Sequence, residues 1–142
     1  MKSKPDCVES TELVRRFVVP GKPVGYYAQG GRSKWRMSPD QRRRAEEYRA
    51  YQEKVRVYAL QAGIKLPLYA DKLHPLVIKT TAYFASGVHF DPENVRKGVA
   101  DSLFYGGSGD KYTGGIFPPP LYDAVNPRVE VEIIAVQSGL GG

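Results

Sequence analysis

The chain of 142 residues has few of the residues on which disulfide-bonded, zinc-binding and membrane-spanning proteins depend. Its one cysteine, Cys7, excludes an internal disulfide and a cysteine-rich zinc site. The two histidines, His74 and His89, do not form a recognisable zinc motif, and we expect structural roles for them. No apolar run is long enough to cross a bilayer, and no apolar stretch follows the charged N-terminus as in a secretory signal. We therefore expect a cytoplasmic protein with no membrane partner.

Acidic residues are outnumbered, and the excess of positive charge is local. Lys and Arg number 21 against 15 Asp and Glu, a net charge of +6, and between Arg32 and Arg56 nine basic residues stand against four acidic ones. A concentrated basic surplus favours partners that carry phosphate. For Trp35, stacking on an unpaired base and a place in the core or at its rim are equally compatible with the sequence. The residues that we expect to contact DNA are Arg32, Lys34, Trp35, Arg36, Arg42, Arg43, Arg49 and Lys111.

Hydrophobic periodicity predicts alternating strands and helices. Strands are expected at Val14–Val19, Leu76–Phe84 and Val129–Val136, with a further short one possible at Val24–Tyr27. A long helix should begin after Ser38, because Ser38, Pro39 and Gln41 have the form of a capping box with proline at the first helical position. One face of this helix carries apolar residues at intervals of three and four, and Gly63 should end it. Those apolar residues are Ala45, Tyr48, Tyr51, Val55, Tyr58 and Ala62.

A second, shorter helix is expected from about Pro92 to Phe104, followed by a glycine-rich loop over residues 106–115. That loop has no G-x-x-x-x-G-K-[ST] pattern, so we expect no nucleotide cofactor. The whole predicts one α/β or α+β domain with a mixed sheet packed against helices, over residues 13–137. We expect residues 1–12 to form a disordered tail and residues 138–142 a flexible one.

The second helix carries the chemistry-bearing residues. Glu93 and Lys97 lie one turn apart on one face, with Asp101 close to that line, and Asp91 precedes the helix. Carboxylate oxygens are the ligands that Mg²⁺ prefers, and a nearby lysine could hold a phosphate or an attacking water. Spacing alone favours a structural interpretation, because such patterns often occur by chance: Asp91 as an N-cap, Glu93 and Lys97 as a surface ion pair, and Asp110 as a turn residue.

The residues between Asp91 and Asp110 resemble the signature of the RusA family of Holliday junction resolvases. That signature has an acidic residue, a spacer, a second acidic residue followed by Asn, and Lys three positions later. An Asp-x-Leu in the same helix and an Asp in the next loop complete it. Glu93 stands where the family usually has Asp, and the single Asp110 where the family has an adjacent pair. The matching positions here are Asp91, Glu93, Asn94, Lys97, Asp101 and Asp110.

The resemblance implies a catalytic function for this segment. By it, Asp91, Glu93 and Asp110 would bind Mg²⁺, Lys97 would be catalytic, and Asn94 and Asp101 would support the site. It also implies a RusA-like mixed fold and a homodimer that cuts paired strands of four-way DNA junctions. Two other interpretations stay open: a nuclease for other branched DNA, and a non-catalytic DNA- or RNA-binding module whose acidic residues only cap and solubilise.

Overall fold

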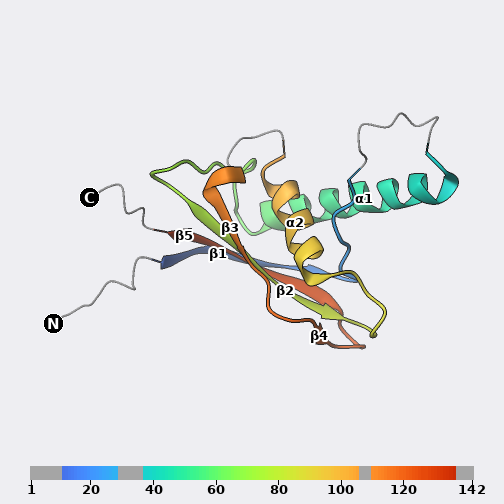
Figure 1. Ribbon diagram of the computed structural model, residues 1–142. Coiled ribbons are helices and arrows are strands. Elements are labelled where there is room, and N and C mark those ends of the chain that lie inside the picture. The colour runs from blue at the N-terminus through green and yellow to red at the C-terminus, as the bar shows by residue number, and fades with distance from the viewer. Residues whose placement is uncertain (1–10, 29–36, 106–109, 137–142) are drawn as a thin grey trace.

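The computed structural model describes residues 11–28, 37–105 and 110–136 of the chain. Two helices cover one face of a single twisted sheet, and β1 begins at the end of that sheet where β5 ends (Figure 1). This arrangement confirms the expected mixed sheet packed against helices in one small α+β domain. The elements are β1 (Thr11–Pro20), α1 (Pro39–Gln61), β2 (Leu76–Phe84), α2 (Pro92–Leu103), the 3-10 helix η3 (Asp110–Tyr112), β3 (Thr113–Ile116), β4 (Leu121–Tyr122) and β5 (Arg128–Val136).

The sheet is mixed because its central strand has partners of both directions. The strand order is β1-β5-β2-β3, and β4 also pairs with β2. The pairs β1–β5 and β5–β2 are antiparallel, whereas β3 and β4 run parallel to β2. A parallel neighbour requires a crossover connection, and the chain from β2 through α2 to β3 supplies it. This crossover places α2 against the half of the sheet that contains β2 and β3.

The core lies between the helices and one face of the sheet. Along β5 the side chains alternate, and Val129, Val131 and Ile133 are buried toward the helices. On α2, Val95, Val99 and Leu103 recur every four residues and have no exposed surface at all, so they form the face of the helix that belongs to the core. Burial of this stripe fixes which face of α2 is left for solvent.

Helix α1 begins and ends where the sequence predicts. The Ser38 hydroxyl accepts a hydrogen bond from Gln41 N–H, and the Gln41 side chain accepts one from Ser38 N–H, so the capping box is formed. The helix ends at Gln61, and Gly63 follows with a positive φ of 86°, which glycine adopts without strain. Most of the expected apolar face is buried: Ala45, Tyr48, Tyr51 and Val55, whereas Tyr58 and Ala62 are half-buried.

Three expectations were wrong. The region 106–115 was expected to be a loop throughout, but Thr113–Ile116 forms β3. Its backbone N–H and C=O groups find hydrogen-bond partners on β2, which outweighs the low strand preference of its glycines. Residues 24–27 form no strand; Tyr26 N–H donates instead to the Asn94 carbonyl on α2 at 2.9 Å. β1 starts at Thr11, inside the expected tail. In the part of the chain that the structure describes, no helix is long and apolar enough to cross a membrane.

Candidate active site on helix α2

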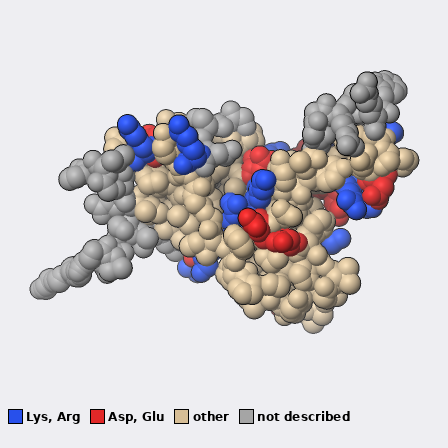
Figure 2. Space-filling view, viewed as in Figure 1, with Lys and Arg blue, Asp and Glu red and all other residues tan. Residues whose placement is uncertain are grey.

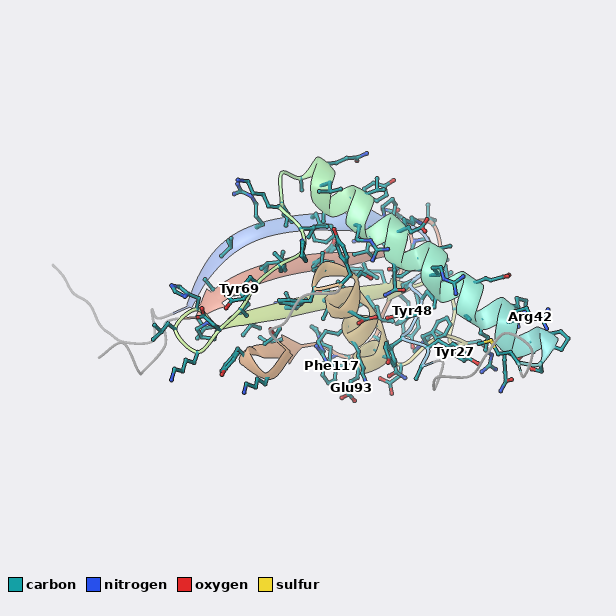
Figure 3. All side chains as sticks on the ribbon, turned by 90° about the horizontal axis from the view of Figure 1, so that it is seen from above. Tyr27, Arg42, Tyr48, Tyr69, Glu93 and Phe117 are labelled. Carbon is teal, nitrogen blue, oxygen red and sulfur yellow. The ribbon has the colours of Figure 1, made fainter. Side chains whose placement is uncertain are left out.

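The first turn of α2 presents two carboxylates. Asp91 is the N-cap, and its Oδ1 accepts a hydrogen bond from Glu93 N–H at 2.7 Å. Pro92 occupies the first helical position, where a missing N–H costs nothing. Both carboxylates are exposed, and neither forms an ion pair with a described residue. Figure 3 shows Glu93 at this end of α2, on the side away from α1. The capping role of Asp91 uses one of its oxygens and leaves the other available.

Lys97 lies one turn further along α2 and is held by an aromatic ring rather than by a carboxylate. Its Nζ is 4.5 Å from the centroid of the Tyr26 ring, a cation–π contact. Tyr26 in turn meets Tyr48 of α1 edge-on, with 5.4 Å between ring centroids. Glu93 and Lys97 form no ion pair, so that structural interpretation of the two residues was wrong. The lysine therefore keeps its charge available at the surface.

Asp101, expected to support the site, is tied to α1. Its Oδ2 accepts hydrogen bonds from the Tyr48 hydroxyl at 2.7 Å and from Gln52 Nε2 at 2.8 Å. Burial, and then the hydrogen bond to Asp101, raises the pKa of Tyr48, so this phenol stays a proton donor across the accessible pH range. Figure 3 shows Tyr48 on the side of α1 that faces α2. We conclude that Asp101 joins the two helices and thereby fixes α2.

Removal of the Tyr48 hydroxyl gives a measurable test of this tie. Tyr48→Phe should lower the free energy of unfolding by about 1–2 kcal/mol, because a hydrogen bond to a charged acceptor is lost while the ring stays in place. Urea unfolding of both proteins measures the difference. The matched control is Gln52→Ala, which removes the second donor to the same oxygen from a half-buried position and should cost less. Equal stability of Tyr48→Phe and the parent protein would contradict the assignment.

A pocket of about 300 Å³ lies beside Lys97, between α2, β3 and the segment that follows β1. Figure 2 shows acidic and basic side chains next to each other on the surface over α2, which Figure 1 places in the middle of this face. The pocket thus combines two basic residues and one acidic residue of α2, and neither Asp91 nor Glu93 lines it. Its lining residues are Tyr26, Arg96, Lys97, Ala100, Asp101 and Thr113.

Arg96 is a member of this pocket that the sequence did not single out. It lies inside the motif but has no partner there, and its side chain crosses β3 at Gly115. The only sequence signal was the pair Gly114-Gly115, which was interpreted as part of a flexible loop. In the structure, a Cβ at Gly115 would overlap Cδ and Nε of Arg96. The glycine thus makes room for the arginine.

Several expected site residues lie outside what the structure describes. The segment that holds four of the expected DNA contacts is not described, and neither is the side chain of Asp110, although its backbone belongs to η3. Among the described residues, no three Asp, Glu, His or Cys side chains form a group that could hold a metal ion. Asp91 and Glu93 are therefore the described part of the expected ligand set. The four undescribed DNA-contact residues are Arg32, Lys34, Trp35 and Arg36.

The basic residues that were expected to contact DNA, where the structure describes them, differ in their exposure and in whether they pair with a carboxylate. Arg42 and Arg49 are exposed on α1, and Figure 3 shows Arg42 toward the N-terminal end of that helix. Arg43 donates a hydrogen bond to Asp40 at 2.6 Å, which lowers the pKa of the Asp40 carboxyl and offsets part of the arginine's charge. Lys111 is exposed, with its Nζ 5.3 Å from the Tyr112 ring centroid. Of the expected DNA contacts that the structure describes, Arg42, Arg49 and Lys111 thus form no ion pair with a described residue.

The hydrogen-bond partners of the two histidines do not include a carboxylate of α2. His89 stacks on Phe84 and is within hydrogen-bond distance of the Tyr122 hydroxyl, at 2.9 Å. His74 lies 2.9 Å from Asp71 in a tight turn. Both rings are engaged in local structure, as expected from the sequence.

Comparison of the chain with models of known protein families, and a search of curated proteins, give no match.

Proposed function

We propose that this protein is a Mg²⁺-dependent endonuclease that resolves four-way DNA junctions. One observation carries the proposal: the first turn of α2 presents the exposed carboxylates of Asp91 and Glu93 with no cationic partner, and Lys97 follows one turn later with no carboxylate partner, all three being described residues. The three side chains stand in the order that resembles the RusA signature, which leaves the carboxylates for a metal ion and the ammonium for a phosphate.

The donor set fits a hard divalent cation. Asp91 has one oxygen free after capping the helix, and Glu93 has a longer side chain in the same turn. Asp91 and Glu93, with Asp110 by the resemblance, would hold the ion. When bound, Mg²⁺ neutralises charge that develops on the phosphate and lowers the pKa of a water molecule.

The remaining residues would bind and position the DNA. Lys97, held above the Tyr26 ring, would contact the scissile phosphate, because an ammonium of this kind is a compact charge with three donors. Asn94 is exposed next to Glu93 and offers amide donors to the backbone of the DNA. Asp101 would act as a positioning residue, since Tyr48 and Gln52 already occupy its Oδ2.

The homodimer is part of the proposal. A four-way junction has approximate twofold symmetry, and its resolution needs matched cuts on two opposed strands. Two copies related by a twofold axis would supply two identical sites at a fixed separation. The exposed arginines of α1 would hold the arms through phosphate contacts, which dominate DNA affinity.

Metal removal tests the proposal directly. Purified protein should cut a synthetic four-way junction into nicked duplexes with Mg²⁺ and should leave it intact with EDTA, in a denaturing gel. A supercoiled plasmid that extrudes a cruciform should be linearised in one binding event, because a dimer makes both cuts before it dissociates. Nicked circles as the lasting product would contradict the dimer, and an uncut junction in Mg²⁺ would contradict the nuclease. Flap and fork substrates in the same gel identify a nuclease for other branched DNA.

A second candidate function is a non-catalytic DNA- or RNA-binding module. It is favoured by the exposed arginines of α1, Arg42 and Arg49, which could meet phosphates without any cleavage chemistry. Retarded but uncut junction in the same experiment would support this function.

A further inference from the structure

Arg96 is a cation whose hydrogen-bonding capacity is incompletely used in the described structure. Its Nε is buried and has no hydrogen-bond partner among the described residues. No described carboxylate forms an ion pair with its guanidinium. A buried N–H donor that is left unpaired costs free energy, because its hydrogen bond to water is lost without replacement. A ligand in the adjoining pocket would supply the missing acceptor.

The side chain of Arg96 is guided to this place by the backbone of β3. A Cβ at Gly115 would overlap its Cδ and Nε atoms, so only glycine lets the arginine lie across the strand. Arg96 and Lys97 both line the pocket of about 300 Å³. The pocket thus has two basic residues that are neighbours along α2.

The charges of the pocket select an anion. Asp101 is its one acidic lining residue, and its Oδ2 is already engaged by donors from α1. Arg96 and Lys97 therefore outnumber it. A guanidinium presents planar N–H groups that match the oxygens of a phosphate, whereas a lysine presents a point charge. An anion with several acceptor oxygens, close in size to a phosphodiester, satisfies both.

We infer that this pocket is a phosphate-binding subsite, in which Arg96 binds one backbone phosphate of the DNA beside the phosphate held by Lys97. The inference rests on the proposed function for its ligand, DNA, but it does not need cleavage. Gly115 belongs to the subsite although it would not contact the phosphate, because its lack of a side chain lets Arg96 lie across the strand.

Solution NMR can observe the arginine itself. The Nε–H signal of Arg96, assigned by its loss in Arg96→Lys, should shift saturably when dimethyl phosphate is added to the wild-type chain. The Nε–H signals of exposed arginines such as Arg49 should shift weakly and without saturation. An Arg96 signal that does not respond, or that responds only as Arg49 does, would overturn the inference. It would mean that the acceptor belongs to the chain itself or that phosphate binds without a site.

Affinity measurements give the second test, and they are made in EDTA so that no strand is cut. Arg96→Ala should weaken junction binding by about five- to tenfold at about 0.1 M salt and lower the slope of log affinity against log salt by about 1, the effect of one lost phosphate contact. Gly115→Ala should weaken binding to a similar degree although the net charge is unchanged, because the new methyl group displaces Arg96. Thermal unfolding of each variant checks that it is folded.

The matched control is Arg16→Ala. Arg16 is exposed on β1, next to Phe17, whose side chain is buried toward the helices, so Arg16 lies on the opposite face of the sheet. It should change junction affinity and the salt slope little. Equal effects of Arg16→Ala and Arg96→Ala would overturn the inference, since net charge alone would then explain both. A wild-type protein that binds the junction through Arg96 but never cuts it would refute the nuclease and leave the subsite standing.

Discussion

Asp91→Asn is expected to abolish junction cleavage while junction affinity stays the same or rises slightly. Loss of the carboxylate removes a ligand that Mg²⁺ requires, and an amide oxygen is a much weaker substitute. We expect the single-turnover rate to fall by a factor of about 100 or more. Affinity should not fall, because the removal of a negative charge near a phosphate cannot weaken the attraction between protein and DNA.

Asp91→Asn should remove the charge of the side chain without disturbing the start of α2. Asp91 caps α2 through a hydrogen bond from Glu93 N–H, and asparagine is as good an N-cap as aspartate. The helix start should therefore survive, and loss of activity cannot be attributed to a frayed helix. Equal thermal stability of the variant and the wild-type protein would verify this point.

A matched control is Asp71→Asn. Oδ1 of Asp71 also accepts a hydrogen bond from the backbone N–H two residues later, that of Leu73, in a turn outside α2. This variant removes the same charge by the same chemistry and should cut the junction at the wild-type rate. If Asp91→Asn also cleaves within a few-fold of the wild-type rate, Asp91 is only a helix cap, and the metal site must be abandoned.

The helices were predictable because their signals are local. The capping box at Ser38 and the Asp-Pro start at Asp91 each lie within four residues, and the stripe of Val95, Val99 and Leu103 follows from helical periodicity alone. β3 was not predictable in this way. Its Thr-Gly-Gly-Ile sequence has the composition of a loop, and only pairing with β2, more than thirty residues earlier, makes it a strand.

In the candidate site, too, local features could be predicted from the sequence and contacts between distant residues could not. The order of Asp91, Glu93 and Lys97 along one helix could be found from spacing. Their neighbours could not, because those contacts join distant parts of the chain: Tyr48 reaches Asp101 across 53 positions, and Tyr26 reaches Lys97 from the segment after β1. Sequence spacing predicts which groups share a helix face, but it does not predict which groups of another element complete that face.

Lys97→Ala should lower the rate of cleavage far more than it lowers affinity. If the ammonium contacts the scissile phosphate as charge develops, its removal should reduce the single-turnover rate by about 100-fold. Binding should weaken only a few-fold, since one phosphate contact is a small share of the many that hold a junction. Quantitative gels at saturating protein give the rate, and fluorescence anisotropy in EDTA gives the affinity.

Arg49→Ala is the opposite case and serves as the matched control. Arg49 is exposed on α1, apart from the first turn of α2, so its loss should weaken binding and leave the rate at saturation unchanged. The two variants together separate chemistry from binding, because each removes one positive charge from an exposed side chain. A fall of rate and affinity in the same proportion for Lys97→Ala would make Lys97 one more backbone contact. The carboxylates of Asp91 and Glu93 would then have to act without a cation beside the reacting phosphate.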